Sequence, residues 1–211
     1  ENIKIITDTT LFAYMHYNYL LAIQDLQPNK GKDKENSIRQ IVWKIRAKKV
    51  ILATGSIERP LTFNNNDRPG IMLANSASKY LNGYGVNLGK NIVIFTNNDS
   101  AYQTAVDFHN QNINVTAIVD VRKNLEGDLP TKVKNLGIKI HTGSIISNTT
   151  GRKKIQTVHI KKINQENIEI LNCDLLCMSG GWSPTVHLFT QSRGKLKFRE
   201  EDSCFIPNQP F

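Results

Sequence analysis

Short apolar runs alternate with polar segments along this chain, and their lengths predict its secondary structure. In the first quarter, apolar runs of strand length are separated by short polar stretches. The expected strands span residues 2–7, 11–16, 19–24, 41–47 and 49–54, with a turn at 17–18 and an exposed hairpin loop over 27–37. This order predicts an antiparallel meander that leads into a buried parallel strand, because the run at 49–54 is almost wholly apolar.

The middle of the chain changes to alternating strands and helices. The asparagine run and the Pro-Gly pair within 63–72 predict a loop. Helical spacing of apolar residues predicts a helix over 73–84, ended by Gly83 and Gly85. A strand over 91–96, a tight turn, a helix over 101–109 and a strand over 114–120 follow. A parallel strand pair joined by a helix is the core of a nucleotide-binding domain.

The remaining pattern predicts a second meander and a second buried strand. The expected elements are a helix at 130–136, a strand at 138–140, meander strands at 144–147, 155–163 and 167–171, a buried strand at 174–179 and a helix at 184–191. We therefore expect an α/β fold with antiparallel meanders. Residues 1–88 and 180–211 would form a truncated first dinucleotide-type domain, and residues 89–179 a second one inserted into it.

Both buried strands end in small residues, with a proline close behind. The first runs into Ala53-Thr54-Gly55 and the second into Gly180-Gly181. Glycine at a strand end lets the backbone turn sharply and approach a ligand, because it has no Cβ. Such paired strand ends are similar to the Ala-Thr-Gly segments of flavoprotein reductases with two dinucleotide-binding domains. We therefore expect Ala53, Thr54, Gly55, Gly180 and Gly181 to bind cofactor.

Two arginines in loops beside the first strand end complete the candidate cofactor ligands. The guanidinium groups of Arg59 and Arg68 can hold a phosphate or a carboxylate. The alternative is a structural ion pair with Glu58 or Asp67. The loop at 63–72 is expected at the surface, since three consecutive asparagines cannot be buried without leaving amides unpaired. The sequence assigns no catalytic residue.

The turn after the strand at 91–96 lacks the glycines that admit a dinucleotide. A working turn reads G-x-G-x-x-G and brings the pyrophosphate to the helix N-terminus. Here it reads Thr96-Asn97-Asn98-Asp99-Ser100-Ala101, where Asp99 opposes a phosphate and Asp99 or Ser100 can cap the helix. Asp120 ends the next strand, where an acid can bind ribose. The turn is therefore either adapted to another ligand or retained as scaffold, and the sequence favours scaffold.

The composition and net charge limit which kinds of partner the chain is expected to bind. Hydrophobic residues make up 39% and charged residues 21% of the 211 residues, which fits a soluble globular protein with a core. The net charge of +9 favours a solvated basic surface, and a docking face for an acidic partner subunit is the next interpretation. Nucleic acid comes last, and we do not expect it, because the basic residues are scattered along the chain. No apolar run approaches the ~20 residues of a membrane helix, so we expect no membrane partner.

Cysteine and histidine spacing indicates neither redox nor metal chemistry. Cys173, Cys177 and Cys204 lack the Cys-x-x-Cys spacing, and the five histidines lack ligand spacing. We expect three reduced thiols, a cytoplasmic compartment and no metal. Because the chain opens at Glu1 in strand-like sequence and shows no signal peptide, we also expect it to be a piece of a longer protein.

Four stretches of sequence carry a specific resemblance. Residues 53–63, 65–74, 95–102 and 179–188 closely resemble the alpha subunit of heterotetrameric sarcosine oxidase, and the likeness runs from about Asn2 to Pro210. Even the turn without glycine resembles that family more than a generic reductase. The resemblance implies an FAD/NAD(P)-binding Rossmann-like fold. It also implies a subunit of a flavoenzyme complex that oxidises sarcosine to glycine and reduces oxygen to peroxide.

The same resemblance implies cofactors and partners. The alpha subunit would hold NAD, or FAD, at its first domain, with FAD on the beta subunit and FMN near the boundary between alpha and beta. Beta, gamma and delta subunits would be partners. Tetrahydrofolate would bind through a domain that this chain lacks. The chain also lacks the N-terminal glycine-rich nucleotide motif of that family, so we expect the chain alone to be inactive. Two alternatives stay open: a non-catalytic scaffold subunit, and a stand-alone FAD/NAD(P)-dependent reductase.

Overall fold

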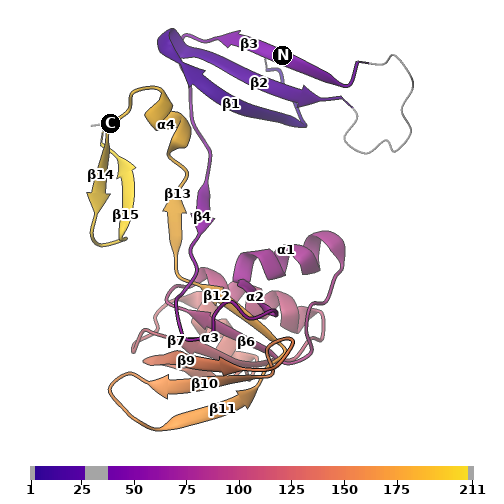
Figure 1. The fold of residues 1–211 in the computed structure, drawn as a ribbon, viewed down its shortest axis with the longest axis vertical. Coiled ribbons are helices and arrows are strands. Elements are labelled where there is room, and N and C mark those ends of the chain that lie inside the picture. Colours follow the sequence, from indigo (N-terminus) through magenta and orange to yellow (C-terminus); the bar gives the residue numbers. More distant parts are fainter. Residues whose placement is uncertain (1–2, 27–37, 209–211) are drawn as a thin grey trace. The chain divides into compact units, whose positions relative to one another are not determined.

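The computed structural model describes residues 3–26 and 38–208, which form two compact units (Figure 1). The first unit comprises Glu1–Ile57 and Ser183–Phe211, and the second comprises Glu58–Trp182. The loop expected at 27–37 lies outside the described residues. The second unit begins well before the boundary expected after residue 88. The strand at residues 71–73 belongs to its central sheet, and the helix at residues 74–84 packs against that sheet.

A five-stranded parallel sheet forms the centre of the second unit. Its strand order is β5-β12-β6-β7-β8, and each neighbouring pair is parallel. The strands are β5 (Ile71–Leu73), β6 (Ile92–Thr96), β7 (Val115–Asp120), β8 (Ile140–His141) and β12 (Leu175–Ser179). The expected strand–helix–strand pattern and the buried strand near 174–179 are therefore confirmed. The expected loop at 63–72 is shorter than predicted, since β5 takes its last two residues.

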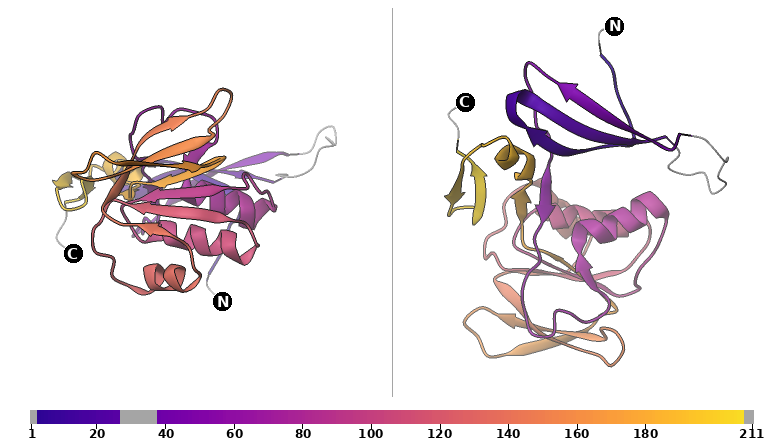
Figure 2. Two further views of the ribbon diagram at one scale, coloured as in Figure 1. Left: turned by 90° about the horizontal axis from the view of Figure 1, so that it is seen from below. Right: turned by 45° about the horizontal axis from the view of Figure 1, so that its top comes forward.

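Helices cover one face of this sheet and an antiparallel meander covers the other (Figure 2). The helices are α1 (Ala74–Tyr84), α2 (Ser100–Asn110) and α3 (Asp128–Asn135). The meander strands are β9 (Ser144–Thr150), β10 (Thr157–Lys162) and β11 (Ile168–Asn172), in the order β11-β10-β9. One buried core joins the helices to the sheet and a second joins the meander to it.

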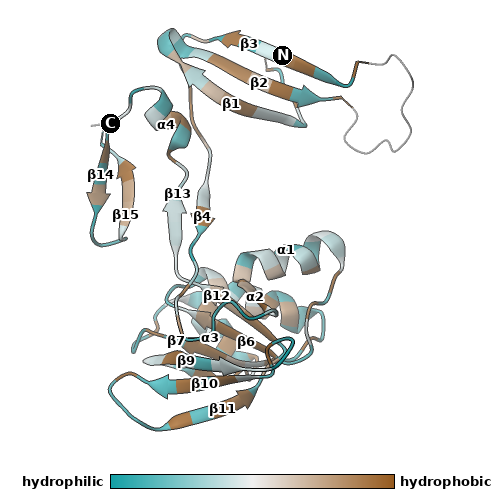
Figure 3. Cartoon of the chain, in the orientation of Figure 1, coloured by the Kyte–Doolittle hydropathy of each residue, from teal (hydrophilic) through white to brown (hydrophobic). Residues whose placement is uncertain are grey.

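The apolar runs explain why this sheet is central. All five residues of β6 are buried, and so are all five of β12. Both strands are mainly hydrophobic, which is the brown end of the scale in Figure 3. Such runs suit parallel strands that are covered on both faces. Helix α1 ends at Gly85, whose φ of 65° is left-handed, as expected for a glycine that terminates a helix.

The first unit contains the meander predicted at the start of the chain. Strands β1 (Thr9–Met15), β2 (Tyr19–Asp25) and β3 (Gln40–Arg46) pair antiparallel. Between β1 and β2 lies the short 3₁₀ turn η1 (His16–Asn18), with Tyr17 in a left-handed conformation. Helix α4 (His187–Gln191) confirms the expected short helix, whereas the hairpin of β14 (Leu196–Arg199) and β15 (Cys204–Pro207) was not expected.

Two predicted strands are wrong. Residues 3–7 have no regular structure, and neither do residues 49–55. Ile51, in the middle of the expected buried strand, is 91% exposed. A buried parallel strand needs neighbours on its edges and cover on both faces, and the described residues of the first unit provide neither to this segment. The short strand β4 (Ser56–Glu58) pairs instead with β13 (Trp182–Pro184).

The length and hydropathy of each helix decide whether it could cross a membrane. Within the described residues, every helix is too short or too polar to cross a bilayer.

Candidate functional site

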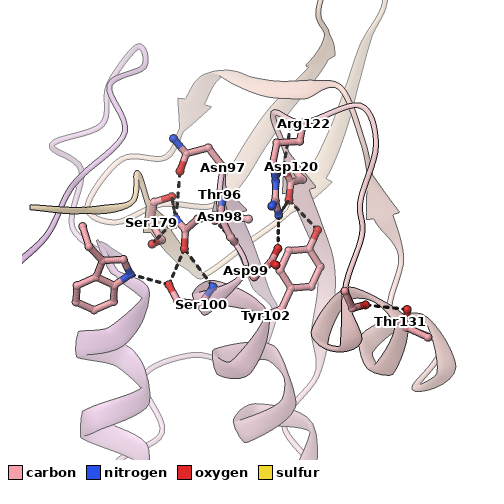
Figure 4. A network of polar contacts seen from close by, with 12 residues as sticks. Thr96, Asn97, Asn98, Asp99, Ser100, Tyr102, Asp120, Arg122, Thr131 and Ser179 are labelled. Atoms are coloured by element: carbon pink, nitrogen blue, oxygen red, sulfur yellow. Dashed lines mark hydrogen bonds and ion pairs between the residues drawn. The ribbon is translucent and has the colours of Figure 1, made fainter. Parts of the chain in front are cut away.

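The carboxyl edge of the parallel sheet is the place where a nucleotide is expected. Strands β7 and β8 lie on one side of β6, and β12 and β5 lie on the other. Ligands of open α/β sheets bind outside the carboxyl ends of the strands, where the strand order reverses. In the second unit this point lies between β6 and β12, next to the turn Thr96–Ala101 (Figure 4).

The Asn98 side chain forms hydrogen bonds with residues on both sides of the turn after β6. Its Oδ1 accepts from the Ser100 amide at 3.2 Å and from the Ser100 hydroxyl at 2.6 Å. Its Nδ2 donates to the Ser179 hydroxyl at 3.0 Å, at the end of β12. The expectation that Asp99 or Ser100 caps α2 is therefore wrong, since Asp99 makes no capping bond and the Asn98 carboxamide reaches the first amide instead.

Trp182 covers the same end of α2. Its indole N–H donates to the Ser100 hydroxyl at 2.9 Å. The helix N-terminus is where a dinucleotide pyrophosphate would bind. Here the Asn98 carboxamide and the Trp182 indole form hydrogen bonds with the Ser100 amide and hydroxyl at that end.

Asp120, the expected ribose acid, is saturated by protein donors. Its side chain is fully buried. Oδ2 accepts from the Tyr102 hydroxyl and from Arg122 Nη2, each at 2.8 Å. Oδ1 accepts from Arg122 Nε at 3.1 Å and from the Arg122 amide at 2.8 Å. A ribose hydroxyl would therefore have to displace an internal bond in order to reach this carboxylate.

Arg122 also neutralises the charge in the turn. Its Nη2 lies 2.8 Å from Asp99 Oδ1, so a single guanidinium bridges Asp99 and Asp120 (Figure 4). The hydrogen bond to Asp120 is the largest cause that raises the pKa of Arg122, and burial followed by the bond to Asp120 raises the pKa of Tyr102. The cluster is thus an ion network centred on the buried Asp120, and the raised pKa keeps the Tyr102 hydroxyl protonated.

These contacts show that the carboxyl edge does not fit a dinucleotide in the ordinary way. The turn has no glycine to admit a phosphate, and its polar side chains bond one another. The acid that would take the ribose is used by Tyr102 and Arg122. The geometry agrees with the scaffold interpretation of the turn, and we derive no chemical step at this edge.

Gly180 and Gly181 serve a close approach of the protein backbone. The Gly180 amide donates to the Arg59 carbonyl at 2.7 Å, and the Arg59 amide donates to the Gly181 carbonyl at 2.8 Å. A Cβ on Gly180 would lie 2.6 Å from the Pro60 carbonyl oxygen, and one on Gly181 would lie 2.9 Å from Arg59 Nη2. The structure thus brings together three predicted site residues, Arg59, Gly180 and Gly181. The close packing between these segments is enough to explain why glycine occupies positions 180 and 181.

The other predicted site residues lie elsewhere. In the first unit, the Thr54 hydroxyl donates to the Thr185 carbonyl at 2.7 Å. Gly55 has a φ of 67° with open space beside it, and Ala53 is exposed. In the second unit, Arg68 precedes β5 and donates through Nη1 to the Gly151 carbonyl. Arg68 therefore lies at the amino edge of the sheet, away from the turn after β6.

Glu58 is a buried residue, which the sequence suggested only as a structural ion-pair partner for a loop arginine. It is 6% exposed, and its Oε2 accepts from the Asn75 amide at 2.9 Å in the first turn of α1. The Ser179 hydroxyl is its second partner. Helix α1 has no capping side chain of its own, so Glu58 supplies the missing acceptor. The apolar Leu73 at the N-cap position was the one available signal.

The charge state of Glu58 makes stability depend on pH. Burial is the largest cause that raises the pKa of Glu58, while its hydrogen bonds from Ser179 and Asn75 lower that pKa in part. The folded state therefore binds the proton more tightly than the unfolded chain. This contribution to stability is full below the unfolded pKa, about 4.3, and is lost as the pH rises through the folded pKa.

We expect Glu58→Gln to gain stability relative to the parent as the pH rises from 4 to 7. The amide keeps an oxygen for the Asn75 N–H and cannot ionise. Urea unfolding at several pH values measures the difference in free energy of unfolding. Glu166→Gln, at a side chain that is 96% exposed, is the control and should leave the pH dependence of that free energy unchanged. Parallel pH curves for Glu58→Gln and the parent would contradict this explanation.

The cysteines behave as core residues. Cys173, Cys177 and Cys204 are free thiols and are buried. Burial is the main cause that raises the pKa of Cys173 to about 12 and also raises that of Cys177, so both thiols stay protonated at neutral pH. Across residues 3–26 and 38–208, no three histidine, cysteine or acidic side chains group as metal ligands would.

Curated relatives extend over almost the whole chain. Sarcosine oxidase subunit alpha from Corynebacterium sp. (strain U-96) is 36% identical over 206 residues, which is 94% of this chain and 21% of the relative. The subunit from Rhizobium meliloti (strain 1021) is 32% identical over 97% of this chain and 20% of its own length. The chain thus spans about a fifth of these relatives. No family model matches it.

Solved structures share the fold at low sequence identity. L-proline dehydrogenase from P. horikoshii aligns with a TM-score of 0.57 and 20% identity over 94% of this chain and 32% of its own. Thioredoxin reductase from Lactococcus lactis aligns with a TM-score of 0.60 and 16% identity over 95% of this chain and 62% of its own. The expected Rossmann-type α/β fold of FAD/NAD(P)-binding oxidoreductases is therefore confirmed, and so is the resemblance to sarcosine oxidase alpha subunits.

Proposed function

We propose that this chain is a segment of the nucleotide-binding alpha subunit of a sarcosine-oxidase-like flavoenzyme complex that oxidises sarcosine to glycine. The observation that carries the proposal is the 32–36% identity to sarcosine oxidase alpha subunits, sustained over 94–97% of the chain. Identity spread over nearly the whole chain reflects more than a shared nucleotide fold. The substrate, the other subunits and a cytoplasmic location are part of the proposal.

In this proposal the two units have different roles. NAD, or FAD, binds at the first domain, where the irregular segment before β4 supplies Ala53, Thr54 and Gly55. FAD and FMN on the complex supply the redox chemistry when bound. The left-handed Gly55 turns the chain without a side chain beside it, and the Thr54 hydroxyl fixes that turn through the Thr185 carbonyl. The second unit is scaffold, because its polar edge groups bond one another.

The remaining proposed assignments concern binding and partners. Arg59, Gly180 and Gly181 hold the entry and exit of the second unit together through their backbone bonds, and Arg59 remains a proposed cofactor ligand. Beta, gamma and delta subunits are the proposed partners. Tetrahydrofolate would bind through a domain outside this chain. A purely non-catalytic scaffold subunit is the second candidate, and the internally bonded turn after β6 is the observation that favours it.

Substrate oxidation by the assembled complex tests the proposal. The full-length gene that encodes this chain would be co-expressed with its neighbouring genes, and peroxide and glycine would be measured with sarcosine as substrate. We expect both products in equal amounts, with NAD and flavin retained by the complex. Oxidation of another secondary amine but not of sarcosine would overturn the substrate assignment. A complex without NAD on the alpha subunit would favour the scaffold candidate.

Nucleotide binding by the 211-residue chain is expected to be weak or undetectable. The Ala53–Gly55 segment is exposed and unpaired by neighbouring strands among the described residues, and the turn of the second unit has no phosphate-binding glycine. Calorimetric titration of the purified chain with NAD and with FAD measures this. A stoichiometric flavin that stays bound through purification would contradict the expectation.

A further inference from the structure

The amino edge of the parallel sheet in the second unit carries a cluster of basic residues, opposite the edge described above. Arg68 lies before β5, Lys90 lies before β6, and Arg152, Lys153 and Lys154 lie between β9 and β10. These five residues are called the basic edge below. They come from three separate segments of the chain, so their juxtaposition is a product of the fold.

Hydrogen bonds and close packing hold the three segments together. The Ile155 amide donates to the Pro69 carbonyl at 2.9 Å, which places the β9–β10 loop beside the approach to β5. The Lys90 amide donates to Asp174 Oδ1 at 2.9 Å. Gly70 lies between the two, because a Cβ there would be 2.7 Å from Ile155 Cγ2 and 3.1 Å from the Asp174 carbonyl oxygen. The basic edge is therefore anchored by the sheet.

Two residues of the basic edge, Lys90 and Lys154, line an open depression of about 400 Å³. Its lining consists of Asn87, Leu88, Gly89, Lys90, Lys154 and Asp174. The Asp174 carboxylate at this depression is already used, since Oδ1 accepts from the Lys90 amide and from the Asn91 amide at 2.8 Å. Lys90 and Lys154 are exposed and line the same depression.

The cations of this edge outnumber its acids. The segments that meet at this edge carry five basic side chains and two carboxylates, Asp67 and Asp174. Arg68 binds the Gly151 carbonyl and so fixes the base of the β9–β10 loop. The other four are exposed, and none of them makes an ion pair within residues 3–26 and 38–208. An anchored, unneutralised cationic surface favours association with an acidic one.

We propose that the basic edge docks an acidic polypeptide segment of a partner subunit. The inference rests on the proposed function, because it places the surface in a multisubunit complex. An acidic polypeptide fits better than nucleic acid for two reasons. The depression has no aromatic side chain on which a base could stack. The carboxylates of Asp67 and Asp174 also interrupt the cations, which a polypeptide with spaced acids tolerates and a continuous phosphate backbone does not.

Charge reversal tests the proposal in the full-length subunit with its co-expressed partners. The variant is Arg152→Glu/Lys153→Glu/Lys154→Glu, and the matched control is Lys79→Glu/Lys123→Glu/Lys162→Glu, which reverses three exposed charges elsewhere in the second unit. Sedimentation velocity at several salt concentrations measures the Kd of assembly, and circular dichroism checks the fold. We expect the first variant to weaken assembly at least about tenfold and to flatten its salt dependence, with the control within about twofold.

Each other outcome overturns a distinct statement. Assembly unchanged in the first variant, or weakened equally in the control, overturns the docking surface. Loss of binding to a fluorescent single-stranded oligonucleotide in the first variant, with assembly intact, assigns the surface to nucleic acid instead. A parent subunit that associates with no co-expressed partner overturns the proposed function, and the inference falls with it.

Discussion

Asp120→Asn is expected to lower the free energy of unfolding of the second unit by about 2–4 kcal/mol. Breaking a fully buried ion pair by removing one partner costs ~3–5 kcal/mol, and Arg122, whose side chain is 32% exposed, keeps part of its hydration. The amide can accept from Arg122 or Tyr102, yet it no longer balances the guanidinium charge. The loss follows from an uncompensated charge, since the shape of the side chain is preserved.

The measurement for this prediction is urea unfolding combined with amide hydrogen exchange of β6 and β7. Exchange reports on the strands that flank the ion network, so it separates the second unit from the first. Glu166→Gln is the control, because its surface pair with Lys161 is worth less than ~1 kcal/mol. If Asp120→Asn cost no more than this control, the carboxylate would be free for a ligand, and the internally bonded site would be a wrong description.

Gly180→Ala is expected to lower the free energy of unfolding by about 1–3 kcal/mol, as overpacking does in a well-packed site. The added Cβ would lie 2.6 Å from the Pro60 carbonyl oxygen and 3.1 Å from the Arg59 carbonyl oxygen. Both are backbone atoms, and the Gly180 amide holds the Arg59 carbonyl at 2.7 Å, so neither segment can move away without losing this bond.

Gly83→Ala is the matched control for this substitution. A Cβ at Gly83 meets nothing within 4 Å, and the residue lies inside α1. Alanine should therefore stabilise the helix by about 0.5–1 kcal/mol. Denaturant unfolding of both variants, with and without NAD, distinguishes the roles of Gly180. A variant of normal stability that fails only in nucleotide retention would show that the glycine serves a ligand.

The sequence predicted the second unit well because its signals are local. The uninterrupted apolar runs of β6 and β12 identify strands buried on both faces, and the absent glycines in Thr96–Ala101 indicate a lost phosphate site. The run at 49–54 is also mainly apolar, but the structure does not bury it as a strand. Ile51 is 91% exposed, because burial depends on neighbouring strands that the described residues do not provide.

The site contacts could not be predicted, since they join distant segments. Arg122 neutralises Asp99 across the sheet edge, and Glu58 reaches the first turn of α1 from the start of the second unit. Neither pairing follows a helical or strand period. Gly180 and Gly181 are positions of close approach, and the approaching group in the structure is the chain segment at Arg59 and Pro60, so their expected cofactor contact stays a prediction.

The central claim is that the turn after β6 carries no nucleotide phosphate. Asp99→Gly in the full-length subunit tests it most directly, because the change removes the opposing carboxylate and restores a glycine. The NAD dissociation constant of the assembled complex, measured by calorimetric titration, should change by less than about twofold. A change of more than tenfold, about 1.4 kcal/mol, would show that the turn is a working nucleotide site and would contradict the account.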